Sequence, residues 1–481
     1  MTVRTAVALT TREYHPFEAA GRRFVYMVPS AAVFGLDETS AAVLDALGER
    51  RMSADDLADD LADRFVPDDV RQTVNELMQV HAIGEAGVLQ EPMSRQMPPT
   101  PFPLTTMVLN VTNQCNLSCG YCYEYGDDKI VDTENGAQPK FMSEETARQS
   151  VEFMLEESRD IETVNLTFFG GETLMNFPVL QKTVEYARGR AAEMGKGIRF
   201  SLTTNATLLR ADIIEWLADN DIGVTVSIDG PKEMQDELRV FKGNGRGTYD
   251  VVAPKVRELL RRHKSRPICA RVTLTRNVLD VMRIYKHLTE EMGFWEVGFA
   301  PVTSSSSRDY AIGDEGFTAM LDQFNELAED FLEAALENRH HGFSNIKDTI
   351  EEIHKGVSKA YPCGAGLGLM GVATDGDVAL CHRFAGSDEH KLGTVESGID
   401  HGLQQEFLEK HHLANKTDCH TCWARPLCSG GCYHEAYTRY GTTARPNLHY
   451  CEWIRSWTDT CLRIYGELAE RNPGYLAIFD G

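Results

Sequence analysis

The sequence lacks the features of a membrane-spanning or exported protein. No apolar run approaches the roughly 18 residues that a spanning helix needs, and the first residues lack the apolar core of a signal peptide. Basic residues are also scarce, because 48 Lys and Arg stand against 72 Asp and Glu, a formal net charge of −24. This balance argues against binding to nucleic acid or to an anionic membrane. We therefore expect a cytoplasmic protein.

The 481 residues exceed one typical domain, and two to four domains are expected. Eleven of the twelve cysteines lie in two groups or close to the second one. In a cytoplasmic protein, clustered cysteines indicate metal binding rather than disulfides.

The first cysteine group contains Cys115, Cys119 and Cys122. It follows residues 104–112, a short apolar run that has the composition of a buried strand. The cysteines therefore lie on a loop at the C-terminal end of a strand, where α/β folds place their chemistry. Three thiolates at this spacing suit an iron–sulfur cluster or zinc. A zinc site needs a fourth ligand, and no nearby residue offers an obvious one, whereas a cluster with one open iron needs only three.

The segment CNLSCGYC (115–122) resembles the signature of the radical S-adenosylmethionine (radical SAM) enzymes, three cysteines at this spacing with an aromatic residue before the third. The resemblance implies that these cysteines hold a [4Fe–4S] cluster whose fourth iron binds the methionine part of S-adenosylmethionine (SAM). In that family, one-electron cleavage of SAM yields a 5′-deoxyadenosyl radical, which removes a hydrogen atom from the substrate.

Strands and helices alternate after this point. The candidate strands are residues 104–112, 164–169, 198–204, 223–228, 270–275 and 296–302, with amphipathic helices between them such as 143–155 and 209–218. Repeated βα units predict a parallel sheet with right-handed crossovers. Six units favour the partial (β/α)6 TIM-like barrel of radical SAM enzymes over a closed eight-stranded barrel, with the site at the strand ends.

Polar residues follow several of these strands. The family resemblance implies SAM-binding roles for Tyr121, Gly170, Gly171, Glu172, Asn205, Ser227, Asp229 and Arg239. Glycines let the backbone approach a ligand closely, and the Glu172 carboxylate suits the ammonium group of SAM. Ser227 and Asp229 are expected near the ribose, and Arg239 towards the SAM carboxylate or the substrate. No catalytic base can be assigned from the sequence.

Residues 1–90 are predicted to form a small α+β domain. The expected elements are a strand over 21–28, a helix over 37–47, a helix from Ser53 to Pro67, and a third helix striped by Val70, Val74 and Leu77. This order resembles the winged-helix peptide-recognition domain (RiPP recognition element) of ribosomally made peptide pathways. Such domains bind a leader peptide as an added strand at a sheet edge. A dimerisation or packing domain is the alternative.

The second cysteine group is richer than one metal site requires. The segment CHTCWARPLCSGGC (419–432) is hard to explain by disulfides. Its four cysteines, together with Cys363, Cys381 and Cys451, give seven thiols. Seven thiols exceed one four-ligand zinc site and fall one short of two. The spacing resembles the SPASM extension of radical SAM peptide maturases, which holds two auxiliary iron–sulfur clusters. By that resemblance, the outer cluster is held by Cys419, Cys422, Cys428 and Cys451, and the inner one by Cys363, Cys381 and Cys432.

The inner set is one protein ligand short. Sulfatase maturases have an extra cysteine soon after the first, and residues 364–368 offer none. Either one iron of the inner cluster stays open, or the cluster is smaller, or a substrate sulfur is the missing ligand. Cys461 and Cys269 are expected to be packed thiols.

These observations predict six segments: a winged-helix peptide-recognition domain (1–90), a Pro-rich linker (91–103), a radical SAM partial barrel (104–310), a helical bridge (311–360), a SPASM domain (361–455) and a C-terminal segment (456–481). In this order and in the CNLSCGYCYEYG segment, the chain resembles the quinohemoprotein amine dehydrogenase maturation proteins. Those proteins install Cys-to-Asp/Glu thioether cross-links in a small subunit.

The resemblance implies hydrogen abstraction from a side-chain methylene of Asp or Glu, followed by closure of a Cys sulfur on the carbon radical. The leftover electron leaves through the auxiliary clusters. The implied partners are a Cys-containing peptide or small protein with a leader segment, and an electron donor. The alternatives are another SPASM maturase, such as one joining sulfur to an α-carbon, and a non-catalytic zinc-stabilised peptide-binding protein. A sulfatase maturase is disfavoured, because His382 follows Cys381 where those enzymes carry an aspartate.

Overall fold

A ten-stranded sheet forms the centre of the structure, in the order β11-β10-β9-β8-β7-β6-β12-β13-β14-β15. The structure is a computed structural model that describes residues 7–48, 50–88, 97–99, 101–133 and 136–480. Six consecutive strands run parallel, namely β6 (Thr106–Asn110), β7 (Thr163–Phe169), β8 (Gly197–Thr204), β9 (Gly223–Ser227), β10 (Ile268–Leu274) and β11 (Glu296–Pro301). They match the six predicted strands, and the expected α/β partial barrel is confirmed.

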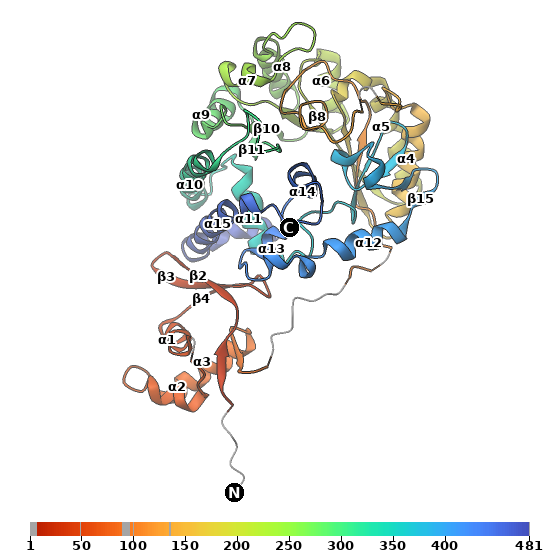
Figure 1. The fold of residues 1–481 in the computed structure, drawn as a ribbon. Coiled ribbons are helices and arrows are strands. Elements are labelled where there is room, and N and C mark those ends of the chain that lie inside the picture. The colour runs from red at the N-terminus through yellow and green to blue at the C-terminus, as the bar shows by residue number, and fades with distance from the viewer. Residues whose placement is uncertain (1–6, 49, 89–96, 100, 134–135, 481) are drawn as a thin grey trace.

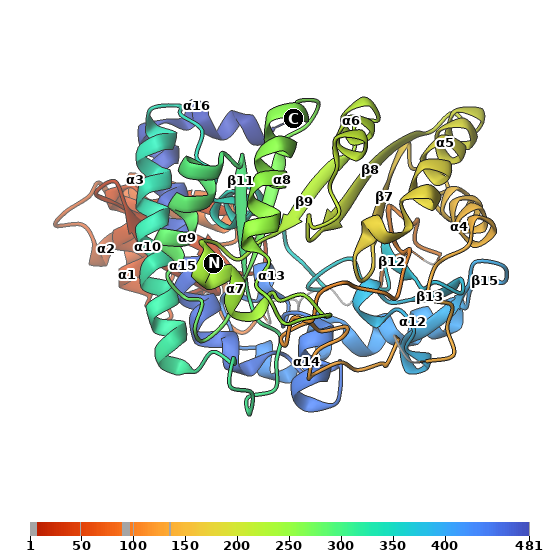
Figure 2. The same cartoon turned by 90° about the horizontal axis from the view of Figure 1, so that it is seen from above.

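Helices cover the outer face of the parallel strands (Figure 1, Figure 2). They are α4 (Glu144–Glu157), α5 (Phe177–Glu193), α6 (Ala211–Asp219), α7 (Lys232–Leu238), α8 (Tyr249–Arg262) and α9 (Val281–Lys286). In β10, Ile268, Ala270, Val272 and Leu274 are buried, and the residues between them are more exposed. Because side chains alternate across a strand, the apolar set packs under the helices and the other set, which includes Arg271, faces the barrel interior.

The C-terminal region continues this sheet. It adds β12 (Leu369–Val372), β13 (Asp377–Ala379), β14 (Lys391–Thr394) and β15 (Gly398–Ile399), of which β12 pairs parallel with β6 and the others pair antiparallel. These strands were not predicted from the sequence. They have two to four residues each, too few to give an alternating pattern. The barrel and the cysteine-rich region therefore share one sheet.

The predicted helical bridge consists of α10 (Asp314–Leu336) and α11 (Ser344–His354), which pack against α15 (Cys451–Arg471). The Phe324 ring of α10 lies 5.5 and 5.3 Å from the rings of Trp453 and Trp457 of α15, measured between centroids. Such edge-to-face pairs stabilise a packed interface beyond their buried area. Because α15 includes residue 455, the predicted boundary between the SPASM domain and the C-terminal segment falls inside a helix.

The N-terminal domain contains a three-stranded sheet, a two-stranded sheet and three helices. The strands are β1 (Leu9–Thr11), β2 (Tyr14–Ala19), β3 (Arg22–Met27), β4 (Val33–Gly35) and β5 (Ile83–Glu85), and the helices are α1 (Glu38–Leu47), α2 (Ala54–Asp60) and α3 (Pro67–Gln79). Ser53 caps α2 as predicted. The prediction that this helix extends to Pro67 was wrong, because α2 ends at Asp60 and Pro67 begins α3. Aspartate is a poor helix former, and proline favours the first helical position. Residues 91–96 and 100 of the predicted linker lie outside the described residues.

The N-terminal domain is docked on the C-terminal helix (Figure 1). Strand β2 packs against α15, where Gly466 leaves room: a Cβ atom there would lie 2.7 Å from that of Ala19. His15 Nε2 is 2.6 Å from Asp459 Oδ1 of α15, and its ring stacks on Trp423 with centroids 3.6 Å apart. The domain therefore contacts the cysteine-rich region directly.

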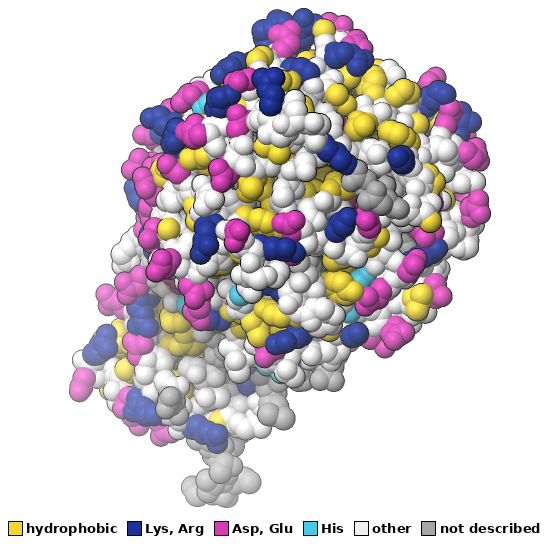
Figure 3. Space-filling model, turned by 45° about the horizontal axis from the view of Figure 1, so that its top comes forward, with side chains coloured by type: hydrophobic (Ala, Val, Ile, Leu, Met, Phe, Trp, Pro, Cys, Tyr) yellow, Lys and Arg dark blue, Asp and Glu magenta, His cyan; other side chains and the backbone are white. Residues whose placement is uncertain are grey.

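The surface carries both signs of charge. On the face shown in Figure 3, acidic and basic side chains are interspersed. In the part of the chain that the structure describes, no helix combines the length and apolarity needed to cross a membrane.

Candidate active site

The first three cysteines lie on a tightly folded loop after β6. The Cys122 N–H donates to the Cys119 carbonyl at 3.0 Å, and the Gly126 N–H donates to the Cys122 carbonyl at 2.7 Å. Gly126 is needed there, because a Cβ atom would lie 2.3 Å from the carbonyl oxygen of Gly120. All three cysteines line one cavity of about 420 Å³ at the C-terminal ends of the barrel strands.

Six of the eight predicted SAM-binding residues line the same cavity: Tyr121, Gly170, Gly171, Asn205, Ser227 and Arg239. The two glycines have a structural role here. A Cβ atom on Gly170 would lie 2.4 Å from the Thr112 carbonyl oxygen, and one on Gly171 would lie 2.2 Å from that of Gln114. The absence of side chains therefore lets the cysteine loop rest on the end of β7.

Glu172, which is predicted to contact the SAM ammonium group, does not line the cavity. Its side chain is fully buried. One oxygen accepts hydrogen bonds from the Thr204 hydroxyl at 2.6 Å and the Leu174 N–H at 3.1 Å, and the other accepts from the Asn205 N–H at 2.8 Å. Burial raises the pKa of Glu172, and these hydrogen bonds oppose the rise. In this geometry Glu172 joins the ends of β7 and β8 and holds Asn205 at the cavity.

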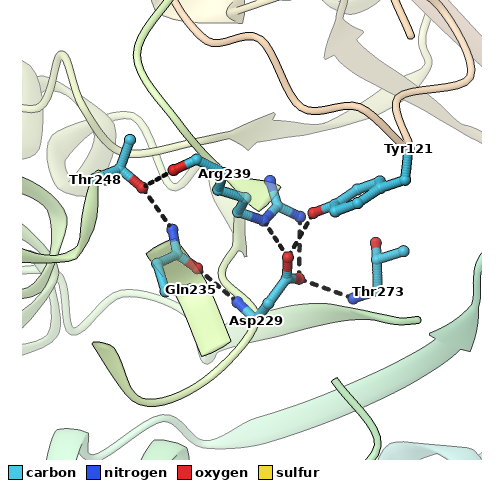
Figure 4. Close-up of polar contacts among 6 residues, drawn as sticks. All are labelled: Tyr121, Asp229, Gln235, Arg239, Thr248 and Thr273. Atoms are coloured by element: carbon cyan, nitrogen blue, oxygen red, sulfur yellow. Dashed lines mark hydrogen bonds and ion pairs between the residues drawn. The ribbon is translucent and has the colours of Figure 1, made fainter. Parts of the chain in front are cut away.

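Asp229 also lies outside the cavity lining, in the centre of a buried network (Figure 4). Its Oδ2 accepts from Arg239 Nε at 2.7 Å and from the Tyr121 hydroxyl at 2.5 Å. Its Oδ1 accepts from Arg239 Nη2 at 3.2 Å and from the Thr273 N–H at 2.9 Å. Both oxygens are therefore engaged within the protein. Asp229 ties the cysteine loop, through Tyr121, to the ends of β9 and β10.

A second cavity of about 430 Å³ lies in the cysteine-rich region. Its lining includes five thiols, those of Cys419, Cys422, Cys428, Cys432 and Cys451. Burial raises the pKa of Cys419 to about 12, and the neighbouring Cys428, Cys422 and Cys451 raise it further. The four predicted outer ligands therefore lie around one cavity.

The three predicted inner ligands form another group. Burial raises the pKa of Cys381 to about 12, and nearby Cys432 and Cys363 add to the rise. Within the described ranges, no three His, Cys, Asp or Glu side chains are placed to hold a single metal ion. Of the remaining cysteines, Cys461 is buried in α15, and Cys269 contacts Glu296 with its Sγ 3.7 Å from Oε2.

Several residues of the first cavity were missed by the sequence analysis: Glu124, Tyr125, Arg271, His382 and Arg383. Burial raises the pKa of Glu124 to about 7. Arg271 carried the clearest signal, because it is a charged residue in the middle of an otherwise apolar strand. His382 adjoins Cys381 and Glu124 lies two residues after Cys122, but only the folded chain places them against the cavity.

Comparisons with known proteins agree with this geometry. The model of the radical SAM superfamily matches residues 109–285, and that of coenzyme PQQ synthesis protein D (PqqD) matches residues 24–83. The serine-type anaerobic sulfatase-maturating enzyme of Bacteroides thetaiotaomicron is 30% identical over 380 residues, which cover 72% of this chain and 86% of that protein. A cysteine-type anaerobic sulfatase-maturating enzyme of Clostridium perfringens is 26% identical over 373 residues, 74% of this chain and 96% of that protein. An uncharacterised protein of Methanocaldococcus jannaschii is 34% identical over 146 residues, 30% of this chain and 46% of that protein.

Solved structures show the same fold. The structure of anSMEcpe with bound AdoMet has a TM-score of 0.63 at 23% identity and covers 79% of this chain and 100% of that one. Streptococcus suis SuiB bound to precursor peptide SuiA has a TM-score of 0.50 at 14% identity, with 92% and 100% coverage.

The fold and the three-cysteine cavity define a radical SAM enzyme. The chain belongs to the radical SAM superfamily, in which it is related to the anaerobic sulfatase-maturating enzymes, and it carries a PqqD-like domain near its N-terminus. The prediction from CNLSCGYC is thus confirmed. Membership supports a [4Fe–4S] cluster and SAM as cofactors. The six domain boundaries, the individual ligands and the SAM contacts stay predictions.

Proposed function

We propose that the protein is a radical SAM peptide maturase that forms Cys-to-Asp/Glu thioether cross-links within a small protein or peptide. One observation carries the proposal: the two cysteine-lined cavities share a wall, made by Arg271, Ala300, Pro301, Thr303 and Arg383. A peptide segment at this wall would lie against the radical SAM site and the sulfur-rich region together. The chain's relation to enzymes named for maturing sulfatases supports a protein or peptide substrate.

The first cavity fits a [4Fe–4S] cluster with one open iron. The cysteine loop offers three thiols to one cavity, which is the donor set that such a cluster needs. With SAM bound, the cluster would supply a 5′-deoxyadenosyl radical for hydrogen abstraction. Gly170, Gly171, Asn205 and Ser227 line the space next to the thiols and would contact SAM. Tyr121, Asp229 and Arg239 would keep the loop fixed to the barrel.

The cysteine-rich C-terminal region fits two auxiliary iron–sulfur clusters. We assign Cys419, Cys422, Cys428 and Cys451 to the outer one, and Cys363, Cys381 and Cys432 to the inner one. The inner set has three thiols, so a substrate thiol would supply the sulfur that it lacks. Clusters of tunable potential would accept the electron released when the thioether closes.

The PqqD-like domain would bind the leader segment of the substrate. Strand β2, at one edge of its three-stranded sheet, packs on α15, and β4 forms the opposite edge. We therefore place the leader on β4, paired as an additional strand.

The experiment is anaerobic. The purified protein is reconstituted, its iron is counted, and 5′-deoxyadenosine is measured after addition of SAM and a reductant. About twelve irons or slightly fewer are expected for three clusters of the usual size. Cys-containing peptides that follow a leader segment are then screened for the loss of two hydrogens. Zinc in place of iron, with no 5′-deoxyadenosine, would support the non-catalytic alternative instead.

A further inference from the structure

Two arginines form part of the wall that the cavities share. Arg271 projects from the middle of β10 towards the barrel interior, and Arg383 lies in the turn that follows Cys381. Each of them lines the first cavity and also the second. A group that spans the two cavities therefore lies beside both guanidinium groups.

Neither guanidinium forms an ion pair with a carboxylate, and Asp348 and Glu435 act on Arg271 and Arg383 only from a greater distance. An ion pair requires a distance of 4.0 Å or less between nitrogen and oxygen. Among the residues that the structure describes, no Asp or Glu oxygen lies this close to a guanidinium nitrogen of Arg271 or Arg383. Arg383 donates one hydrogen bond, from Nη1 to the Thr303 hydroxyl at 3.0 Å, and stacks over the Tyr123 ring at 4.7 Å. The buried Arg239, in contrast, has both oxygens of Asp229 as partners.

The strand next to β10 makes room for Arg271. Gly298 of β11 is its register partner, and a Cβ atom on Gly298 would lie 3.1 Å from Arg271 Nη1. The guanidinium thus lies along a bare stretch of backbone. Burial lowers the pKa of Arg271, the nearby positive charge of Arg383 lowers it further, and the Asp348 carboxylate offsets part of this effect. Two cations that repel each other in a cavity form a site for an anion.

We propose that Arg271 and Arg383 form a carboxylate site that holds an acidic side chain of the substrate peptide at the wall between the cavities. This inference rests on the proposed function and assigns part of its specificity. Guanidinium groups match the two oxygens of a carboxylate. Fixing the carboxylate also fixes the methylene beside it, as hydrogen abstraction requires. An amide side chain of the same shape has no charge and is held more weakly.

The first test maps arginine reactivity in the reconstituted wild-type enzyme under anaerobic conditions. Phenylglyoxal modifies accessible arginines, and mass spectrometry locates the labelled residues. The probes are N-acetyl-glutamate methylamide, its glutamine counterpart and SAM, each added separately. We expect the glutamate probe to slow labelling of Arg271 and Arg383 about fivefold or more relative to the glutamine probe, because only the former is charged. SAM alone should leave both arginines reactive.

Two results would overturn the proposal. Protection by SAM alone would assign the arginines to the carboxylate of SAM. Equal labelling with the glutamate and glutamine probes would show that no carboxylate is selected. The outcome is separable from that of the proposed function, because a wild-type enzyme that produces 5′-deoxyadenosine and still shows no selective protection refutes the carboxylate site alone.

The second test measures binding of the same two capped residues by calorimetry. We expect the wild type to prefer the glutamate probe about tenfold, which equals about 1.4 kcal/mol. Arg271→Gln should reduce this ratio to about one. Arg271→Lys should keep part of it, because an ammonium group retains the charge but cannot donate two parallel hydrogen bonds to a carboxylate as a guanidinium does. Arg199→Gln is the matched control: Arg199 lies on β8 and lines neither cavity, so the full ratio should remain. A tenfold ratio in Arg271→Gln would refute the site.

Discussion

Arg239 and Asp229 form a buried ion pair with the Arg239 Nε 2.7 Å from Asp229 Oδ2 and side-chain exposures of 9% and 2%. The Tyr121 hydroxyl donates to the same oxygen, so the pair holds the residue that directly precedes Cys122. Three of the predicted SAM-binding residues are therefore coupled in one network, which also fixes the cysteine loop.

Breaking this ion pair should destabilise the protein strongly. Asp229→Asn removes the charge and leaves the buried Arg239 uncompensated, which typically costs about 3–5 kcal/mol. Urea unfolding of the apoprotein measures the loss. Asp212→Asn serves as the control, because its pair with Arg210 is exposed on both sides and should have little effect. An equal effect of both substitutions would contradict the role given to Asp229.

Tyr121→Phe separates the loop contact from the ion pair. The variant removes one hydrogen bond to a charged oxygen and keeps the ring, so a loss of about 1.5–3 kcal/mol is expected. Hydrogen exchange of the cysteine loop should accelerate in this variant, while that of the N-terminal domain should not. Unchanged exchange in the loop would mean that Asp229 does not hold it through Tyr121.

Gly171→Ala should impair loading of the first cluster. The added Cβ would lie 2.2 Å from the Gln114 carbonyl oxygen, so the cysteine loop must shift. Iron after reconstitution should fall by about four atoms per chain, the content of one [4Fe–4S] cluster. Gly189→Ala in α5 is the control, because nothing lies within 4 Å of its added Cβ and alanine favours a helix. Full iron content in Gly171→Ala would contradict the close packing of loop and strand.

His411 should make the protein less stable in acid. Its Nε2 is 2.8 Å from the Thr443 hydroxyl and its Nδ1 is 2.6 Å from the Phe407 carbonyl oxygen, and burial lowers its pKa to about 4. The unfolded chain binds this proton near pH 6.5, so the stabilisation is present above that pH and is lost progressively down to about pH 4. Carbon-13 NMR titration should show no protonation of His411 at pH 5.5. The drop in urea midpoint from pH 7 to pH 5 should shrink in His411→Gln.

The β4 edge can be tested without disturbing the domain core. Leu36 donates its N–H to the Arg23 carbonyl, so by alternation the Val33 N–H points away from β3. Val33→Pro should remove a donor for an added strand and weaken leader binding several-fold, as measured by fluorescence anisotropy with the leader of a peptide found in the cross-linking screen. Val33→Thr keeps the N–H and should bind normally. Normal binding by Val33→Pro would move the leader away from this edge.

The features that sequence predicted well depend on local pattern. The spacing of Cys115, Cys119 and Cys122 and the six apolar strand runs identified the superfamily and the barrel. Features set by tertiary contacts were not predicted. The carboxylate of Glu172 meets Thr204 and Asn205 across neighbouring strands, and Arg383 reaches the barrel from the cysteine-rich region. Strand β12 pairs with β6, and β13, β14 and β15 are added in turn beside it, so their short segments gave no independent signal.

Hydrogen abstraction from an acidic side chain can be followed by the transfer of deuterium from the substrate to 5′-deoxyadenosine. A substrate peptide from the mass-loss screen is made with deuterium on the side-chain methylenes of its Asp or Glu, and a second copy carries deuterium on the α-carbon only. We predict deuterium in 5′-deoxyadenosine from the first peptide and none from the second. Deuterium from the α-labelled peptide alone would contradict this account and assign the enzyme to sulfur-to-α-carbon chemistry.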